Sequence, residues 1–258
     1  MTTNGAPPDP AYRVRVLLLR HGQVPHHKGD VPLTDLGVAQ ADAAGRWFGR
    51  EGFEVAGLLS GETTRTRDTA EVFAEGVRAE GGVIPDPMVS FALRNPDLYL
   101  GGHRINLAQG AEALAAQSPS TEPDDVEASL FYAELMAAPD RVGYWLEHPD
   151  PPGDDAAAVG VRIDRFARSL ADVPAWRGRT VVGMTHSPVL RAVRFRHEGV
   201  YTREPPFLHG YSLTLGHDGH LRFDTVTTDT GDIPATSRPG PGVVRPEDEP
   251  PEKEDHTR

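Results

Sequence analysis

Residues 14–22 read VRVLLLRHG, an almost continuous apolar run that stops at Arg20, His21 and Gly22. A short apolar run without alternation predicts a strand buried on both faces, as in a parallel sheet. From Thr34 onward, apolar residues recur at helical spacing until Gly52 ends the pattern. The beginning of the chain is therefore predicted to form a strand, a loop and a helix.

The same alternation of strand and helix patterns continues along the chain. It predicts further strands over 55–60, 83–90 and 179–185, a hairpin of 211–215 and 221–226, and helices over about 63–76, over 125–138 and beyond 154. In the helix over 125–138, we expect Val126, Leu130, Phe131 and Leu135 to face inward. This order predicts an α/β fold: a three-layer sandwich with a mostly parallel central sheet, helices on both faces and a helical insertion or lid.

Composition divides the chain into three parts. Residues 1–11 lack apolar periodicity, and residues 235–258 are rich in proline and acidic side chains, so neither segment buries enough surface to offset its ordering entropy. We therefore predict a disordered N-terminal arm over 1–11 and a disordered acidic tail over 235–258. Between them, one α/β domain is expected over 12–234, with an insertion over about 95–153.

The overall charge and the absence of cysteine exclude several functions. The 258 residues include 26 basic and 38 acidic side chains, for a net charge of −12, and no cysteine. Disulfides, thiolate metal sites and a catalytic thiol are excluded, and the acidic balance argues against nucleic acid as a partner. No apolar run approaches the roughly 20 residues of a transmembrane helix, and the N-terminus does not resemble a signal peptide. These features predict a cytoplasmic protein without a membrane partner.

Reactive side chains follow three of the predicted strands. Arg20 and His21 end the first strand, Arg65 lies shortly after the second, and His186 ends the late one. Each alone has an ordinary explanation, such as a surface ion pair or a hydrogen-bonded histidine. Ligands in such sheets bind at the carboxyl ends of the strands, so these four side chains are expected to share one pocket. Two imidazoles and two guanidinium groups together suit phosphoryl transfer.

Three sequence blocks resemble, in order, the motifs of one family. They are LLLRHGQV…PLTDLGVAQA over 17–41, SGETTRTRDTAE over 60–71 and VVGMTHSPVLRAV over 181–193. All three resemble blocks of the histidine phosphatase superfamily, also called phosphoglycerate mutase-like proteins. The resemblance implies a phosphomonoesterase that acts on a small phosphorylated metabolite, without metal or cofactor, through a phosphohistidine that water hydrolyses.

The resemblance also implies roles for individual residues. His21 would be the nucleophile, while the arginines and the second histidine would surround the phosphoryl group and stabilise its charge. A backbone N–H at the start of the helix after the late strand would bind the phosphate, and a glycine would let the backbone approach it closely. No metal site is expected, because the arginines supply positive charge and HExxH is absent. The implied phosphate-binding set is Arg20, Arg65, His186, Ser187 and Gly22.

The proton donor departs from the family pattern. Where the common bacterial branch carries a glutamate after the third strand, this sequence has Asn95, within Leu-Arg-Asn-Pro-Asp over 93–97. Because asparagine is not a useful proton donor, the predicted catalytic acid is Asp97, two residues further on. Two alternatives stay open: another carboxylate, such as Glu112, supplies the proton, or the activity suits substrates with good leaving groups. The Gly-Glu-Ser segment of the family corresponds here to Gly153-Asp154-Asp155, which we predict to cap a helix.

Two other functions stay open at this stage. One is a cofactor-dependent phosphomutase, and the other is a non-catalytic pseudoenzyme that binds phosphorylated ligands, which Asn95 suggests. The segment after the third strand lacks a Glu-Arg-His-Tyr-Gly type of sequence and the middle of the chain holds few cations, so hydrolysis is favoured. The substrate and the assembly state, including a homodimer, are also left open. We expect the aromatic residues of the insertion to form core rather than contact a ligand: Tyr99, Phe131, Tyr132, Tyr144 and Trp145.

Overall fold

The computed structural model describes residues 11–27, 29–106 and 110–230. The predicted arm, apart from Ala11, and the predicted tail lie outside the described residues. None of the helices in the described part of the chain is long and apolar enough to span a membrane.

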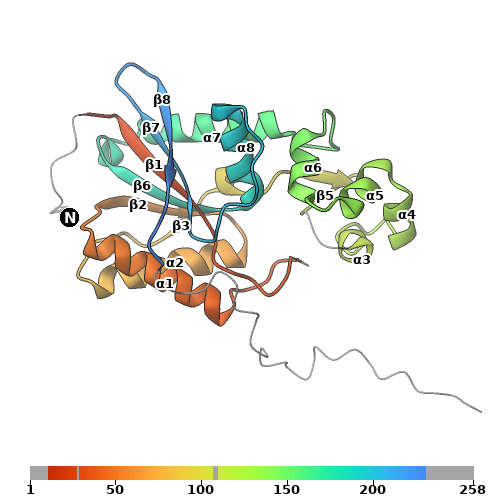
Figure 1. Cartoon of the computed structure of the whole chain (residues 1–258), viewed down its shortest axis with the longest axis horizontal. Helices are drawn as coiled ribbons and strands as arrows, with labels where there is room; N and C mark the ends of the chain where they lie inside the picture. The colour runs from red at the N-terminus through yellow and green to blue at the C-terminus, as the bar shows by residue number, and fades with distance from the viewer. Residues whose placement is uncertain (1–10, 28, 107–109, 231–258) are drawn as a thin grey trace, which may run out of the picture.

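A six-stranded mixed sheet forms the centre of the molecule (Figure 1). Four strands run parallel, and the last two form the predicted antiparallel hairpin. The apolar run after Tyr12 becomes the strand β1, near the middle of the sheet, as its burial on both faces requires. In spatial order the strands are β3 (Met88–Val89), β2 (Val55–Ser60), β6 (Thr180–Thr185), β1 (Val14–Arg20), β7 (Gly210–Leu215) and β8 (Leu221–Val226).

Helices cover both faces of this sheet and confirm the predicted three-layer sandwich (Figure 1). Along β1, Val16 and Leu18 join one hydrophobic core while Leu17 and Leu19 join the other, as the two-residue period of a strand requires. The core with Leu17 includes the helices α1 (Asp35–Arg50) and α2 (Thr64–Ala79), and the opposite core includes α7 (Ala156–Leu170) and α8 (Ser187–Glu198).

Local sequence signals explain where two of these helices begin. The Thr34 hydroxyl accepts a hydrogen bond from the Gly37 backbone N–H at 3.0 Å and caps α1. The Asp155 carboxylate accepts one from the Ala158 N–H at 2.6 Å, which confirms the predicted N-cap of α7. The caps fix the start of each helix relative to the strand before it.

The segment between the sheet strands β3 and β6 contains the predicted insertion. Its short elements gather to one side of the sheet (Figure 1). Trp145 anchors them, because its fully buried ring donates a hydrogen bond from Nε1 to the Asp154 carbonyl oxygen at 2.9 Å. The elements are η1 (Phe91–Leu93), β4 (Leu98–Leu100), β5 (His103–Ile105), α3 (Ala111–Ala115), α4 (Pro123–Ala128), α5 (Leu130–Ala137) and α6 (Arg141–Glu147), and a further short helix, η2 (Pro174–Trp176), precedes β6.

Two predicted elements are wrong in detail. The strand over 83–90 is reduced to Met88 and Val89, because Pro85 and Pro87 supply no backbone donors to a sheet. The helix over 125–138 is broken at Ser129 into α4 and α5. This break turns Leu130 outward, where it is 79% exposed.

The aromatic residues of the insertion mostly form core, as predicted. Phe131, Tyr132 and Trp145 are buried, Tyr144 packs against the same cluster, and Tyr99 is 48% exposed.

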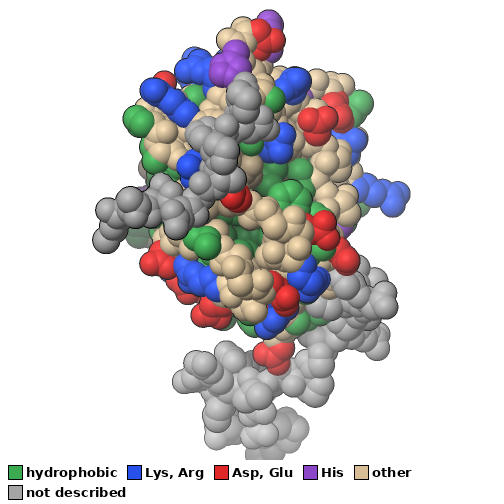
Figure 2. Space-filling model, turned by 90° about the vertical axis from the view of Figure 1, so that its left-hand side faces the viewer, with side chains coloured by type: hydrophobic (Ala, Val, Ile, Leu, Met, Phe, Trp, Pro, Cys, Tyr) green, Lys and Arg blue, Asp and Glu red, His purple; other side chains and the backbone are tan. Residues whose placement is uncertain are grey.

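On the outer surface seen from the left of Figure 1, acidic and basic side chains are interspersed around a few hydrophobic ones (Figure 2).

Candidate active site

The carboxyl ends of β1, β2 and β6 meet at a pocket of about 730 Å³. Parallel strands place these ends at one edge of the sheet, so residues distant in sequence converge there. The insertion supplies part of the wall, and the loop between α8 and β7 supplies another part. The lining residues are Arg20, His21, His27, Arg65, Asn95, Ala138–Val142, His186–Pro188, Arg203 and Glu204.

His21 follows β1 directly and is held as a buried, neutral imidazole. Its side chain is 3% exposed, and Nδ1 lies 2.7 Å from the Gly22 carbonyl oxygen. Because a carbonyl only accepts, Nδ1 carries the proton and Nε2 keeps its lone pair. Burial first, and then the charges of Arg65 and Arg20, hold the pKa of His21 well below its usual range. The ring is therefore a nucleophile at neutral pH.

Arg20, the last residue of β1, is fixed by the loop between α8 and β7. Its guanidinium donates to the Pro205 carbonyl oxygen at 2.8 Å, pairs with Glu204 at 2.9 Å and stacks over the Phe207 ring at 4.1 Å. Burial lowers its pKa, while Glu204 opposes that shift. The side chain is therefore aimed at the pocket before any ligand arrives.

Arg65 reaches the pocket from the first turn of α2. Its guanidinium is 7% exposed and lies 3.6 Å from the Asp30 carboxylate. Asp30 also accepts from the Thr64 backbone N–H at 2.9 Å, so it holds the start of α2 and the arginine together. Burial lowers the pKa of Arg65, and Asp30 opposes that shift.

His186 and Ser187 connect β6 to the N-terminus of α8. His186 is 1% exposed, and its ring centroid lies 5.5 Å from that of His21. Burial, followed by the charge of Arg65, holds the pKa of His186 well below its usual range. Ser187 is 4% exposed at the first position of the helix, where backbone N–H groups lack helical partners.

Several buried polar atoms of the pocket lack a hydrogen-bond partner among the described residues. Buried groups without partners are rare in folded proteins, so this cluster has hydrogen-bonding capacity left for a bound molecule. They belong to residues from three different strand ends and come together only in the fold. The atoms are Arg20 Nε, Arg65 Nε, His186 Nδ1, His186 Nε2 and Ser187 Oγ.

Gly22 does not line the pocket, and packing explains why this position is glycine. A Cβ atom here would lie 2.6 Å from the Gly37 carbonyl oxygen. A Cβ on Gly37 would in turn lie 2.2 Å from the carbonyl oxygen of Gln23. The two glycines let the loop after His21 cross the first turn of α1, so Gly22 positions His21 through the backbone.

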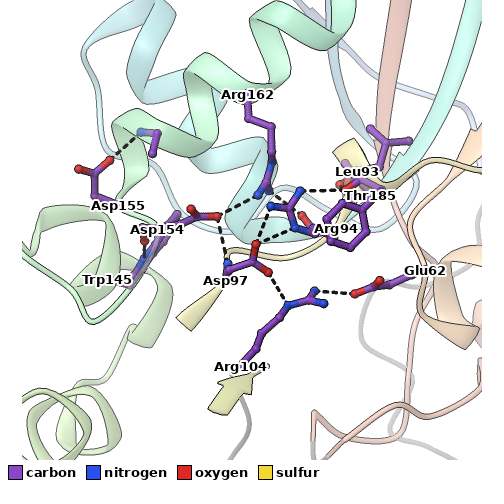
Figure 3. Close-up of polar contacts among 12 residues, drawn as sticks. Glu62, Leu93, Arg94, Asp97, Arg104, Trp145, Asp154, Asp155, Arg162 and Thr185 are labelled. Carbon is purple, nitrogen blue, oxygen red and sulfur yellow. Dashed lines mark hydrogen bonds and ion pairs between the residues drawn. The ribbon is translucent and has the colours of Figure 1, made fainter. Parts of the chain in front are cut away.

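The structure does not bring Asp97 into the pocket. Its carboxylate lies between two arginines: Arg94 approaches at 2.5 Å and Arg104 forms a second ion pair (Figure 3). These contacts outweigh partial burial and lower its pKa, whereas a catalytic acid at neutral pH needs a raised one. Asp97 therefore joins Arg94, which follows η1, to Arg104 of β5, outside the pocket lining.

The other carboxylates considered as proton donors are either held in an ion pair or absent from the pocket lining. Asp154 accepts from Arg162 at 2.9 Å and from the Asp97 backbone N–H at 3.1 Å (Figure 3). Glu112 is exposed in the first turn of α3 and does not line the pocket. Asn95 does line it, with 7% exposure, at the place where the family resemblance puts a glutamate.

Sequence reasoning did not assign four of the residues that line the pocket: His27, Asp140, Arg203 and Glu204. His27 lies in the loop after β1, with its ring centroid 6.3 Å from that of His21, and burial lowers its pKa. Asp140 caps α6, and Arg203 and Glu204 belong to the loop after α8. His27 was detectable as a histidine six residues after the nucleophile, but the other three depend on tertiary contacts. In the described ranges, no cluster of three or more His, Asp or Glu is placed to hold a metal ion.

Comparisons with known proteins agree with this geometry. Residues 16–86 match the family model described as histidine phosphatase superfamily, branch 1. The matched segment contains Arg20, His21 and Arg65, while His186 lies beyond it. No curated protein sequence matches the chain significantly.

Solved structures share the fold at low sequence identity. A mycobacterial glucosyl-3-phosphoglycerate phosphatase is 22% identical with a TM-score of 0.54, and the match covers 82% of this chain and 97% of that one. A phosphoserine phosphatase of Entamoeba histolytica is 13% identical with a TM-score of 0.53, covering 84% and 98%. A phosphoglycerate mutase of Bacillus anthracis is 14% identical with a TM-score of 0.51, covering 84% and 94%. The family model and the shared fold therefore agree: residues 16–86 match the histidine phosphatase superfamily, and the chain has the fold of these three solved structures.

Proposed function

We propose that this histidine-type phosphatase hydrolyses phosphomonoesters of small metabolites through a phosphohistidine at His21. The observation that carries the proposal is the set of buried polar groups without protein partners, two of them arginine N–H donors, around a neutral imidazole. A phosphoryl group has three peripheral oxygens that accept such hydrogen bonds, and its charge compensates the buried arginines.

The arrangement supports a two-step reaction. In the first step, His21 Nε2 attacks phosphorus while Arg20, Arg65 and His186 hold the peripheral oxygens. The N-terminus of α8, at Ser187, contributes backbone N–H groups to the same oxygens. In the second step, water attacks the phosphohistidine and releases inorganic phosphate. The protein supplies positioning and positive charge in both steps.

The rim of the pocket supports a substrate that carries a second anionic group. Arg141 from α6 and Arg203 from the loop after α8 both line the pocket, and neither forms an ion pair among the described residues. In a chain of net charge −12, two arginines left without carboxylate partners beside a phosphate site favour a carboxylate or a second phosphate. The named substrates of two proteins with this fold, glucosyl-3-phosphoglycerate and phosphoserine, both carry a carboxylate.

A panel of phosphate esters tests this function. The wild-type protein, treated with a chelator, is assayed for phosphate release from phosphorylated acids, sugar phosphates and an aryl phosphate. We expect turnover without metal, a preference for phosphorylated acids, and loss of turnover in His21→Asn. The absence of turnover with every ester, aryl phosphate included, would contradict the proposal and leave the protein a phospholigand-binding module.

A phosphomutase is the second candidate, because Arg141 and Arg203 would also hold the acid group of a phosphorylated acid during its reorientation. Adding a bisphosphate primer together with one monophosphate isomer separates the two functions. A mutase forms the other isomer, whereas a phosphatase releases inorganic phosphate whether or not primer is present.

A further inference from the structure

The proposed reaction requires an acid that the predicted residues do not supply. The leaving alkoxide needs a proton in the first step, and the attacking water must lose one in the second. Asn95 has no acidic proton, and Asp97 lies outside the pocket between two arginines. Among the described residues that line the pocket, the carboxylates are Asp140 and Glu204.

Asp140 is engaged by both of its oxygens. Arg191, which is 2% exposed, donates to Oδ1 and to Oδ2 at 2.7 Å each. Oδ1 also accepts from the Gly143 backbone N–H at 2.9 Å and caps α6. These contacts, Arg191 first, lower the pKa of Asp140 and keep it ionised. Its role is to join the insertion to α8.

Glu204 is placed differently. Its Oε2 lies 2.9 Å from an Arg20 terminal nitrogen, so its carboxylate sits against one of the groups that bind the phosphoryl oxygens. Its side chain is 47% exposed and lines the pocket, so both solvent and a ligand can reach it. Glu204 is also close enough to His27 to act on the charge of that ring. It therefore lies at the rim, beside the phosphate site.

Resting on the proposed function, we propose that Glu204 is the acid–base catalyst of both steps. A phosphoryl group bound to Arg20 competes with the Glu204 carboxylate for the same donors. Substrate binding thereby displaces Glu204 from its ion pair with Arg20 and leaves its carboxyl group beside the phosphoryl group, within the pocket lining.

The protons and bonds balance over the cycle. In the first step the bond between phosphorus and the ester oxygen breaks, the bond between phosphorus and His21 Nε2 forms, and the Glu204 proton goes to the ester oxygen as alcohol leaves. In the second step Glu204 accepts a proton from water, the hydroxide oxygen bonds to phosphorus, and the phosphorus–nitrogen bond breaks. Glu204 ends protonated, His21 ends neutral, and inorganic phosphate departs.

Leaving-group dependence tests the assignment. We compare wild type and Glu204→Gln by kcat/KM for an aryl phosphate and for an alkyl phosphate, because kcat/KM reports the step that forms phosphohistidine. An aryl oxide leaves without being protonated, whereas an alkoxide must receive a proton as it leaves. We expect kcat/KM to fall about 100-fold or more for the alkyl ester and less than about fivefold for the aryl ester. In the aryl reaction, phosphohistidine should also accumulate, because its hydrolysis has lost the base.

Matched variants keep the outcome interpretable. Glu198→Gln removes a carboxylate from an ion pair with Arg194 on the outside of α8, away from the pocket lining, and should leave both esters unchanged. An equal loss of kcat/KM for both esters in Glu204→Gln would overturn the assignment. A loss of kcat/KM confined to the alkyl ester in Asp140→Asn or in His27→Gln, and not in Glu204→Gln, would also overturn it. If wild type forms no phosphohistidine with either ester, the proposed function itself fails, which is a separate result.

Discussion

The imidazole rings of His21 and His186 meet edge to face, with centroids 5.5 Å apart, below the pocket mouth. Both rings are almost fully buried, and both lie near Arg65 and Arg20. Burial first, and then the charge of Arg65, lowers the pKa of both rings, so the fold holds both neutral. The same arrangement leaves a pocket of concentrated positive charge that an anion stabilises.

The neutral histidines make stability depend on pH. Their pKa values are lower in the folded than in the unfolded chain, so the unfolded chain binds more protons at acidic pH. The free energy of unfolding is therefore unaffected above about pH 7 and falls as pH drops below about 6.5, by up to about 1.4 kcal/mol per pH unit for each histidine. Urea unfolding at pH 7.5 and 5.5 measures this loss.

His186→Asn should lose less stability than wild type over the same interval, because one of the buried titrating groups has been removed. His103→Asn, on the exposed surface of β5, serves as the control and should behave as wild type does. Identical pH dependence in His186→Asn and wild type would contradict the assigned environment of His186.

Arg65 and Arg67 provide a matched pair on α2. Arg65 points into the pocket, and Arg67 is exposed two residues later. Arg65→Ala should lower kcat/KM by about 100-fold or more, because one of the charges that stabilise the transferring group is lost. Arg67→Ala should stay within about twofold of wild type. Comparable losses in the two variants, measured with one ester, would contradict the placement of Arg65.

Inorganic phosphate should stabilise the folded protein. At a concentration of 100 times its Kd, a ligand that binds only the native state adds about 2.7 kcal/mol to the free energy of unfolding. We expect phosphate to raise the Tm of wild type and to have little effect on Arg65→Ala, whose pocket lacks a phosphate-binding charge. Thermal scans with phosphate and with an equal ionic strength of chloride measure the difference. A rise of the same size in the variant would indicate binding elsewhere.

Asp97 should matter for stability rather than for proton transfer. Its side chain is 14% exposed and joins Arg94 to Arg104. Asp97→Asn should lower the free energy of unfolding by about 1–3 kcal/mol, because two partly buried cations lose their counter-charge. Its kcat/KM should change by the same factor for aryl and alkyl esters. A loss confined to the alkyl ester would restore Asp97 as the catalytic acid.

The sequence predicted the central sheet because burial on both faces leaves a strong pattern. Residues 14–19 contain no polar side chain except Arg15. This apolar character is consistent with the place of β1 between two neighbouring strands, β6 and β7. The strand-end positions of His21 and His186 were predictable for the same reason, since each ends an apolar strand. Burial, periodicity and position agree in these segments.

The insertion and the rim of the pocket were less predictable. The apolar spacing around Leu130 fits one helix, but the chain turns at Ser129 and the tertiary packing leaves Leu130 exposed. Glu204 lies far from Arg20 in sequence and meets it only because β7 pairs with β1 and brings the preceding loop to the pocket. The sequence around either residue contains no pattern that predicts such a contact.

Trapping the phosphoenzyme tests whether His21 is the nucleophile. The wild-type protein is mixed with a phosphate ester, quenched in alkali to preserve phosphohistidine, digested, and analysed by mass spectrometry. We predict one phosphate per chain, acid-labile, on the peptide that contains His21, and none in His21→Asn. Turnover with no phosphate on His21, or with the phosphate on another residue, would show that His21 is not the nucleophile.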